Sequence, residues 1–398
     1  MSPQSLQIRL CDDLASLEAL RGPWNDLLAD FPGATVFCTL DWLLAWWRAF
    51  GAGRQLHVLG FFDPDGRLAG LAPLSLFRET HGPVTLKSMQ MMGDGSGDSD
   101  NLDFPVRPGW EDSVAAAFLD HLKSERRLWD VCQFNTLPSD SLVARALTTR
   151  LGGAGWVLYT TGTITQVIDL PETWEKYLAE LSAKERTKVG YRSRKLAKTH
   201  QVRFHKCDAE SDLPACLSVL FDLHQKRWTS SGEPGSFGSV ERRQFYGEMA
   251  KAFLNRGWLE FWLLDLDGVT VAAQFGFRYR ETFFSLQEGF DPALSLDSVG
   301  YVLRAYAIQQ LIAAGVRRYD FLGGEDPAKT RWGARAGRYI NVHLARARSI
   351  GGLYLQSTHQ LGASKEYLRT HLPRPAWNLL HKLNLALLGS REGGAGRE

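Results

Sequence analysis

The stretch LEFWLLDLDGVTVAAQFGFRYRETFFSLQEGF, residues 259–290, decides the fold of this sequence. It contains apolar runs that are separated only by short polar turns. Connections this short permit only antiparallel pairing, so the stretch predicts an antiparallel meander. A helical pattern at residues 299–314 and the strand-like run RRYDFLGG, residues 317–324, follow. Because a helix between two strands forms a crossover, we expect this last strand to lie parallel to residues 281–290, or splayed from them.

The first part of the chain has much the same order. Two apolar runs lie on either side of Asp65 and Gly66, and an Asp-Gly turn between such runs predicts a β-hairpin. A segment rich in Gly, Asp and Ser follows at residues 91–104, which we expect to be a loop that ends in a strand at Leu102 and Phe104. A helical pattern and a further strand come next, so this part also predicts an α+β module. A duplicated module is therefore our hypothesis.

The bulk composition indicates two soluble domains and no particular partner. With 398 residues the chain is too long for one ordinary core. Its 46 basic and 44 acidic side chains leave a net charge of +2, so any site for a polyanion must be a local patch. The five cysteines include no C-x-x-C pair, so we expect no metal site. A signal-peptide pattern and long apolar runs are lacking, so we expect a cytoplasmic protein without a transmembrane segment.

A Gly-rich break, GGAG, separates the two parts. We place the boundary near residue 160, which predicts an N-terminal module at residues 1–160 and a C-terminal module at residues 161–350. Residues 351–398 alternate basic and apolar side chains and predict a helical tail that either docks on the protein or lies on a membrane surface. We favour docking, and we expect the last residues, 389–398, to be disordered.

The segment DSVG, residues 297–300, leads directly into the helical pattern and is the first candidate site. The first amides of a helix lack intrahelical partners and carry partial positive charge, so they bind phosphate groups. Gly300 would let a pyrophosphate approach the backbone closely. Asp297 or Ser298 could equally act as an ordinary N-cap, and the segment alone leaves both interpretations open.

Polar groups crowd the end of the last predicted strand in RRYDFLGGEDPAK, residues 317–329. Asp320 lies in the strand, while Glu325 and Lys329 follow the glycine turn, an arrangement typical of sites in α/β sheets. The structural alternative is a helix that is capped by acidic residues and has Pro327 in its first turn. The sequence does not decide between the two.

His224, Arg227 and Trp228 share one face of a predicted helix, because residues three and four positions apart are neighbours on a helix. Histidine is the side chain most easily poised as a base near neutral pH, although a single helical histidine is more often structural. His224 is therefore a candidate base, and its two neighbours are candidate contacts of the substrate.

The segment SAKERTKVGYRSRKLAK, residues 182–198, is strongly basic. Lys184, Lys188, Arg192 and Lys195 are spaced by four, four and three positions, so they lie on one helical face and repel one another. A CoA phosphate, a nucleic acid, an anionic polymer or lipid headgroups would relieve this repulsion. The alternative is a solvated surface helix without a ligand.

Several of these segments, in this order, resemble one known family. They are LSAKERTKVGYRSRKL at residues 181–196, HQKRW at 224–228, VAAQFGF at 271–277, GFD at 289–291 and DFLGGEDPAK at 320–329. Together they resemble the acetyltransferase-like domain of the CelD-like (cellulose-biosynthesis) and FemAB-related proteins, a branch of the GNAT superfamily. Two positions depart from the family pattern, because Val299 replaces the usual proline and Ala328 replaces the usual tyrosine.

This resemblance implies an α+β fold of two tandem GNAT-like modules, each a mixed, mostly antiparallel sheet flanked by helices. It implies an N- or O-acyltransferase that moves an acyl group from acetyl-CoA, or another acyl-CoA, to an amine or hydroxyl of a small molecule or polymer. The donor would lie on Ser298, Val299, Gly300 and Tyr301, with its thioester beside Gln274 and Phe275.

The same resemblance suggests roles for the remaining candidates. The base would be Asp320, Glu325 or His224, with a slight preference for Asp320. Lys329 or Arg227 would orient a carboxylate or phosphate, and the further contacts of the substrate would be Trp228, Lys188 and Arg192.

Two other functions stay open. FemAB relatives use aminoacyl-tRNA, and the basic helix would suit an RNA backbone, whose binding weakens steeply with salt. The second is a non-enzymatic GNAT-fold module that binds within exopolysaccharide assembly.

Overall fold

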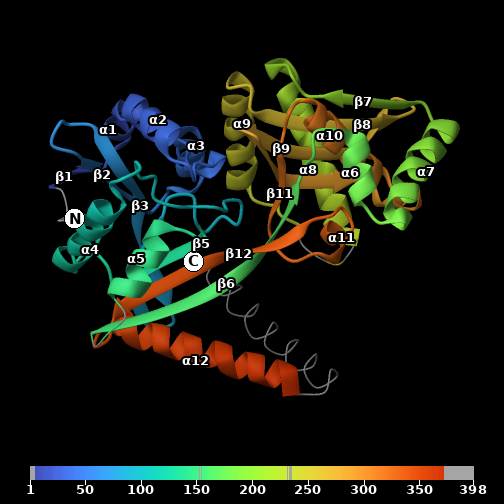
Figure 1. Ribbon diagram of the computed structural model, residues 1–398. Coiled ribbons are helices and arrows are strands. Elements are labelled where there is room, and N and C mark those ends of the chain that lie inside the picture. Colours follow the sequence, from blue (N-terminus) through green and yellow to red (C-terminus); the bar gives the residue numbers. More distant parts are fainter. Residues whose placement is uncertain (1–4, 152, 154, 231, 233–234, 372–398) are drawn as a thin grey trace, which may run out of the picture.

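The computed structural model describes residues 5–371 except residues 152, 154, 231, 233 and 234 (Figure 1). Its N-terminal half contains β1 (Gln7–Cys11), α1 (Leu14–Ala19), α2 (Arg21–Asp30), η1 (Val36–Cys38), α3 (Leu40–Phe50), β2 (Gln55–Phe62), β3 (Leu68–His81), β4 (Val84–Met91), α4 (Glu111–Ser124), β5 (Val131–Pro138), α5 (Leu142–Arg150) and β6 (Trp156–Asp169). Its C-terminal half contains α6 (Trp174–Glu180), α7 (Ala183–Thr199), β7 (Val202–Lys206), η2 (Glu210–Asp212), α8 (Leu213–Ser230), α9 (Val240–Asn255), β8 (Leu259–Leu266), β9 (Val269–Tyr279), β10 (Thr282–Phe290), η3 (Pro292–Asp297), α10 (Val299–Ala313), β11 (Arg318–Gly323), α11 (Pro327–Thr330), β12 (Arg335–Arg346) and α12 (Ile350–His371). The two halves have nearly the same order of helices and strands.

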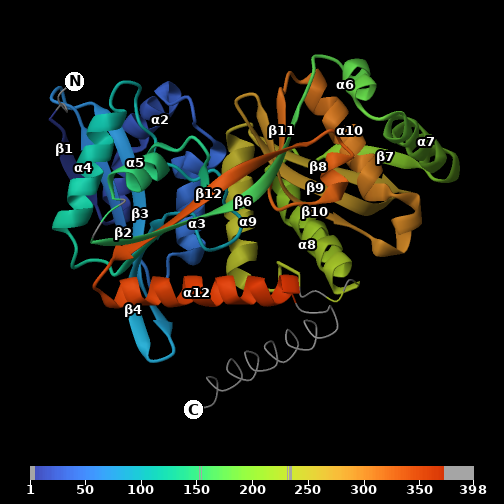
Figure 2. The same cartoon turned by 60° about the horizontal axis from the view of Figure 1, so that its bottom comes forward.

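One twelve-stranded sheet runs through the whole molecule in the order β1-β2-β3-β4-β5-β12-β6-β11-β10-β9-β8-β7 (Figures 1 and 2). From either edge the pairing has the same pattern, in which three antiparallel pairs are followed by one parallel pair and one antiparallel pair. The long strands β6 and β12 pair with each other at the centre. Each half therefore takes its sixth strand from the other, and residue 160 lies inside this shared pair.

The predicted strand order of the C-terminal half is confirmed. β8, β9 and β10 form the antiparallel meander, and β10 lies parallel to β11 with the crossover helix α10 between them. The predicted fold, two modules that each contain a mixed, mostly antiparallel sheet flanked by helices, is also confirmed.

The predicted strand at Leu102 and Phe104 is wrong. Both side chains are buried, but the segment forms only an isolated bridge between Val106 and Gly70. Pro105 explains this, because proline has no N–H with which to extend a ladder.

α3 joins the two modules through buried aromatic side chains. Trp42 and Trp46 are fully buried. Trp42 packs edge-on against Phe245 of α9 and Phe277 of β9, with 5.1 and 5.7 Å between ring centroids. Its Nε1 donates a hydrogen bond to Ser99 Oγ at 2.9 Å. One apolar cluster extends through both halves, so we expect the modules to unfold together.

The last described helix, α12, lies along the strand pair β6–β12 (Figure 2). Leu355 is buried there, and Tyr159 of β6 stacks on His359 with 3.9 Å between ring centroids. Within the described part of the chain, every helix is too short or too polar to span a membrane. Residues 389–398, which we expected to be disordered, lie outside the described residues.

Candidate active site

β10 and β11 diverge soon after they begin, and this splay is the centre of the candidate site. They pair over three residues, ending with Phe284 and Asp320. Beyond this point β10 has a bulge between Ser285 and Gln287 against β9, while β11 continues against β6. Two parallel strands that separate leave backbone groups unpaired between them, so the splay can receive an extended ligand. Asp320 stands at the point of divergence.

The predicted donor site lies where β10 leads through η3 into α10. Ser298 has left-handed backbone angles, φ 59° and ψ 40°, and makes no side-chain cap hydrogen bond. The carboxylate of Asp297 is engaged elsewhere, because it accepts a hydrogen bond from Lys195 Nζ at 2.9 Å. The interpretation of these residues as ordinary N-caps is therefore wrong. Neither side chain covers the first amides of α10, and such amides bind anions.

The start of α10 is held closely against β10. A Cβ at Gly300 would stand 3.1 Å from the ring of Phe290, which is tighter than most contacts of this kind. Val299 is fully buried, and the hydroxyl of Tyr301 donates to Glu185 Oε2 at 3.1 Å. Any larger residue at position 300 would therefore move the amides that a ligand would meet.

α7 places its basic face beside the start of α10. Lys188 Nζ lies 4.6 Å from the ring centroid of Tyr301, and Arg192 Nη1 donates to the carbonyl of Leu296 at 2.7 Å. Lys195 lies one turn further along and bonds to the segment before α10. Lys188 also lies 3.5 Å from Glu185 Oε2 and Lys195 is paired with Asp297, so Arg192 is the one of these three cations without a carboxylate partner among the described residues. Cations beside a helix start attract phosphate. Lys188 and Arg192, predicted as contacts of the substrate, therefore lie beside the predicted donor residues.

Asp320 is a buried carboxyl, with 6% of the residue exposed. Its Oδ1 accepts the amide of Leu322 at 2.8 Å, and Leu322 has φ 62°, a left-handed angle that a bulky residue adopts only under restraint. Burial, with a smaller contribution from the nearby Asp100, raises the pKa of Asp320 to about 6. A carboxyl with this pKa is ionised at neutral pH and is a stronger base than an ordinary aspartate.

The Asp loop, residues 92–110, crosses from the N-terminal module to this site. The hydroxyl of Tyr246 donates to Asp98 Oδ1 at 3.0 Å, and the amide of Gly323 donates to Asp100 Oδ2 at 2.7 Å. Burial raises the pKa of both carboxyls. The sequence did not identify them as site residues, and the one available signal was a run of Asp and Gly without helical or strand periodicity.

His224 belongs to a buried polar network where α8 packs on β10. Its ring bonds Gln287, which also bonds the hydroxyl of Tyr246. Burial, together with Arg227 and Arg242, lowers the pKa of His224 to about 4, so its ring is neutral at neutral pH. Its Nδ1 has no hydrogen-bond partner within the described residues. In the described part of the chain, His224 Nδ1 is therefore an unpaired but buried atom, and the ring is a weaker base than the carboxylate of Asp320.

Gln274 and Phe275, predicted beside the thioester, have different surroundings. Gln274 Nε2 donates to the hydroxyl of Tyr319 at 2.6 Å, and its Oε1 lacks a partner in the part of the chain that the structure describes. Phe275 is fully buried and packs against Tyr246. Phe275 is a core residue, while Gln274 has acceptor capacity left.

The segment after β11 has features of both interpretations of its sequence, the polar site at a strand end and the helix capped by an acidic residue. Lys329 Nζ donates to the carbonyls of Phe321 and Gly324 at 3.3 and 3.0 Å, and burial lowers the pKa of Lys329. Asp326 caps α11, as the structural alternative predicted, and Glu325 is exposed. Lys329 therefore braces the glycine turn next to the splay.

Arg227 and Trp228 lie at the C-terminal end of α8. The Arg227 guanidinium stands 5.1 Å from the ring centroid of Phe290 and 5.6 Å from that of Trp228, which is 38% exposed. This pair is thus on the β10 side of the splay, next to the residue that contacts Gly300. The described residues contain no group of three or more His, Cys, Asp or Glu placed to hold a metal ion.

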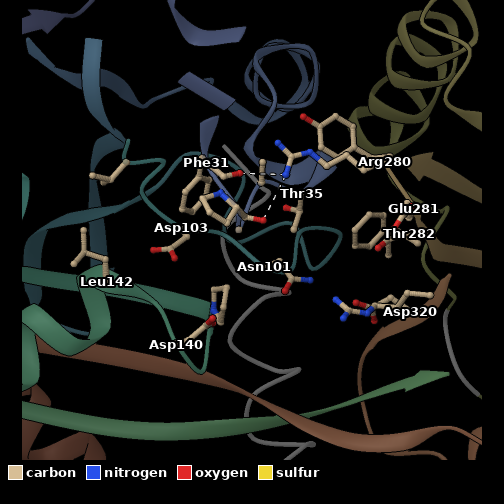
Figure 3. Close-up of a pocket in the computed structure, with 18 of the residues that line it drawn as sticks. Phe31, Thr35, Asn101, Asp103, Asp140, Leu142, Arg280, Glu281, Thr282 and Asp320 are labelled. Atoms are coloured by element: carbon tan, nitrogen blue, oxygen red, sulfur yellow. Dashed lines mark hydrogen bonds between the residues drawn. The ribbon is translucent and has the colours of Figure 1, made fainter. Parts of the chain in front are cut away.

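A cavity of about 920 Å³ opens between the modules on the side of Asp320. Figure 3 shows Asp103 and Asp140 of the N-terminal module across this cavity from Asp320. Arg280 fixes one wall by donating to the carbonyl of Phe31 at 3.2 Å. The cavity does not include residues 298–301, but it reaches the carboxyl at which the splay begins. A ligand in the cavity and a ligand in the splay would therefore meet at Asp320.

Comparison with known families identifies one domain. Residues 183–330 match the family model described as an acetyltransferase (GNAT) domain. This range begins with α7 and ends with α11, so it includes the start of α10, the splay and Asp320. No curated protein matches the sequence.

Comparison with solved structures identifies the fold of almost the whole chain. The crystal structure of FemX aligns with a TM-score of 0.60 at 11% identity, covering 86% of this chain and 98% of that chain. A conserved protein of unknown function from Bacteroides thetaiotaomicron VPI-5482 aligns with a TM-score of 0.54 at 15% identity, covering 85% and 99%. At such low identities the likeness establishes a shared fold and nothing further.

Proposed function

We propose that this protein is a GNAT-type acyltransferase that moves an acyl group, acetyl in the simplest case, from a CoA thioester to an amine or hydroxyl. The observation that carries this proposal is the start of α10. It has no side-chain cap, it is flanked by the cations of α7, and it adjoins a splay that begins at a buried carboxyl. We assign donor binding to residues 161–350 and a supporting role to residues 1–160. The resemblance to CelD-like and FemAB-related proteins supports the same proposal.

The donor would bind along the splay. Its pyrophosphate would accept hydrogen bonds from the amides of Val299 to Tyr301, and Lys188 and Arg192 would attract the phosphates. The thioester would then lie near the bulge of β10. Leu286 has no partner on β9 at this bulge, so its N–H is free of that ladder and would stabilise the oxyanion.

The chemical step would be a direct attack. The carboxylate of Asp320 takes the proton from the acceptor's amine or hydroxyl, and the freed electron pair forms the bond to the thioester carbon. The carbon–sulfur bond then breaks, and CoA leaves as a thiolate. This route needs no covalent intermediate on the protein.

Calorimetric titration with acetyl-CoA and free CoA tests the donor site. We expect the wild type to bind both, and Gly300→Val to lose most of this affinity because the new side chain meets Phe290. Ser298→Phe should weaken binding as well, since the bulky ring would cover the first amides. Wild-type affinity in both variants would contradict the proposal.

Aminoacyl transfer from tRNA is a second candidate function. The basic residues Lys184, Arg186, Arg194 and Lys198 are exposed on α7, and the fold is shared with FemX. RNA binding through such residues should fall steeply with salt. Retention of tRNA at low salt, without measurable binding of CoA, would favour this function over the first.

A further inference from the structure

The large cavity at Asp320 continues into a longer groove between the modules. It adjoins two further cavities of about 330 and 480 Å³. Asp140 lines all three, and Asp320 and Arg318 line both the first and the smallest. We call this continuous surface the inter-module groove. It is longer than one small molecule needs, so it suits a ligand that reaches beyond Asp320.

In the described part of the chain, the inter-module groove is lined by four exposed arginines whose side chains form no ion pair: Arg145, Arg317, Arg318 and Arg338. Arg145 comes from α5, Arg318 from β11 and Arg338 from β12. Within the described residues, the side chains of Arg145 and Arg338 form no hydrogen bond or ion pair. Other groove arginines differ, because Arg280 bonds backbone carbonyls and Arg335 pairs with Asp169.

Three acids of the groove, Asp169, Glu111 and Asp103, are paired, hydrogen-bonded or deeply buried. Asp169 is paired with Arg335, and Glu111 accepts the amide of Gly109. Burial raises the pKa of Asp103 to about 7.

Asp140 and Glu281 are further acids of the groove. Arg317 and Arg318 line the cavity that contains Asp320, whereas Arg145 and Arg338 line the cavity at the other end, where Asp140 is the one acid among the described lining residues. That end therefore carries two cations against one acid.

That end also carries hydroxyl groups. Ser139, Thr148, Thr160 and Thr161 line the same cavity as Arg145 and Arg338. A planar guanidinium binds carboxylate and phosphate in a bidentate manner, and hydroxyls can donate to the remaining oxygens. The combination is that of an anion-binding wall beside the β6–β12 strand pair.

We propose that the inter-module groove binds the acceptor through an anionic group, a phosphate or a carboxylate, which lies between Arg145 and Arg338. The acceptor's amine or hydroxyl then points along the groove to Asp320. This inference rests on the proposed acyl transfer, because that function makes the bound molecule an acceptor. The anion site itself can be tested without it. It narrows the substrate class to acid-bearing molecules that span the distance from the β6–β12 pair to the splay.

Calorimetric titration with tripolyphosphate and with citrate tests this site in the full-length protein. The groove variant Arg145→Gln/Arg338→Gln should bind at least one probe roughly tenfold more weakly than the wild type, while its affinity for free CoA is unchanged. Arg150→Gln is the matched control, because Arg150 lies on the same helix, pairs with Asp112 and is outside the groove. Circular dichroism establishes that each variant is folded.

A donor-site variant, Lys188→Gln/Arg192→Gln, separates the two sites. It should lose affinity for CoA and keep its affinity for citrate. Loss of tripolyphosphate alone in the groove variant identifies a phosphate-bearing acceptor, and loss of citrate alone identifies a carboxylate-bearing one. The inference is overturned if the groove variant binds both probes as the wild type does, or if the wild type binds neither. Failure of the wild type to bind CoA would count against the acyltransferase proposal only.

Discussion

The two crossover helices, α4 and α10, occupy corresponding places in the two modules but begin differently. Each follows the fourth strand of its module and leads to the strand that is parallel to it. α4 has Glu111 and Asp112 in its first turn, whereas the first turn of α10 has no acidic residue. Acidic side chains at a helix start interact favourably with the positive end of its dipole. Glu111 and Asp112 therefore place negative charge at the start of α4, whereas the start of α10 has no such charge of its own. The fold alone therefore does not make a donor site.

The segments that precede α4 and α10 also differ, both in their length and in the module that their acidic side chains contact. Before α10 lies the short η3, whose Asp297 is paired with Lys195 of α7. Before α4 lies the Asp loop, which leaves its own module and brings Asp98 and Asp100 to the splay of the other one. The C-terminal module thus has an uncapped helix start at the proposed donor site, whereas the loop of the N-terminal module contributes side chains beside the splay.

The largest expected effect concerns the carboxyl at the splay. Asp320→Asn cannot accept the acceptor's proton, so we expect turnover to fall by at least ~10²-fold with unchanged affinity for CoA. In the wild type, turnover should fall as the pH drops below about 6, because the carboxylate becomes protonated. Asp94→Asn is the matched control, since Asp94 is a buried carboxyl with a raised pKa in the N-terminal module. Full turnover in Asp320→Asn would remove it as the base.

A second substitution copies the start of α4 into α10. Gly300 and Asp112 are both the second residue of their helix. In Gly300→Asp the new carboxylate repels phosphate and its Cβ presses on Phe290, so the affinity for CoA should fall by more than ~10-fold. Gly300→Ala adds the same Cβ without charge, so the difference between the two variants measures the electrostatic part. Equal affinities in Gly300→Asp and the wild type would mean that these amides do not hold the donor.

A smaller effect is expected from the cations that distinguish α10 from α4. Lys188→Gln and Arg192→Gln should each weaken CoA binding by roughly 2- to 10-fold, because each removes one charge beside the phosphates. The loss should be greatest at low ionic strength, since salt screens exposed charges. Lys176→Gln, which changes an exposed lysine paired with Glu172 on α6, should bind CoA as the wild type does. A salt-independent loss would indicate a structural role for α7 instead.

The sequence predicted the parts of this arrangement that depend on local pattern. Short turns determine that β8, β9 and β10 pair with their sequence neighbours, and a helix between β10 and β11 makes them parallel. Nothing local indicates that β6 pairs with β12, because the partners are far apart in the chain and each is an ordinary strand in sequence. The exchange of the sixth strands was therefore not predicted, although the duplicated order of elements was.

The candidate site depends on the same kind of local pattern, and its role stays a prediction. The start of α10 and Asp320 could be named as candidates because a helix start and a strand end have recognisable neighbours in sequence. The spacing of Lys188 and Arg192 predicted an anion site on α7, and the packing of α7 on α10 places both side chains beside the start of α10. Whether an anion binds there stays a prediction. Asp98 and Asp100 lie in a loop without periodicity, so their place beside the other module depends on tertiary contacts that the sequence does not indicate.

The smallest expected effect concerns Asp103, a buried carboxyl of the N-terminal module to which we assign a structural role. Burial raises the pKa of Asp103 from 3.8 to about 7, although Ser141 and the amide of Phe104 donate to its Oδ1. The folded protein thus holds this proton more tightly than the unfolded chain. The stabilisation is complete at low pH and is lost as the pH rises from about 4 through about 7.

Asp103→Asn removes this titration and keeps an oxygen that can accept both hydrogen bonds. We expect its Tm to match that of the wild type at pH 5 and to exceed it by roughly a few degrees at pH 8. Calorimetric melting curves at the two pH values measure the difference. Parallel changes of Tm in the two proteins would show that the cost of ionisation arises at a group other than Asp103.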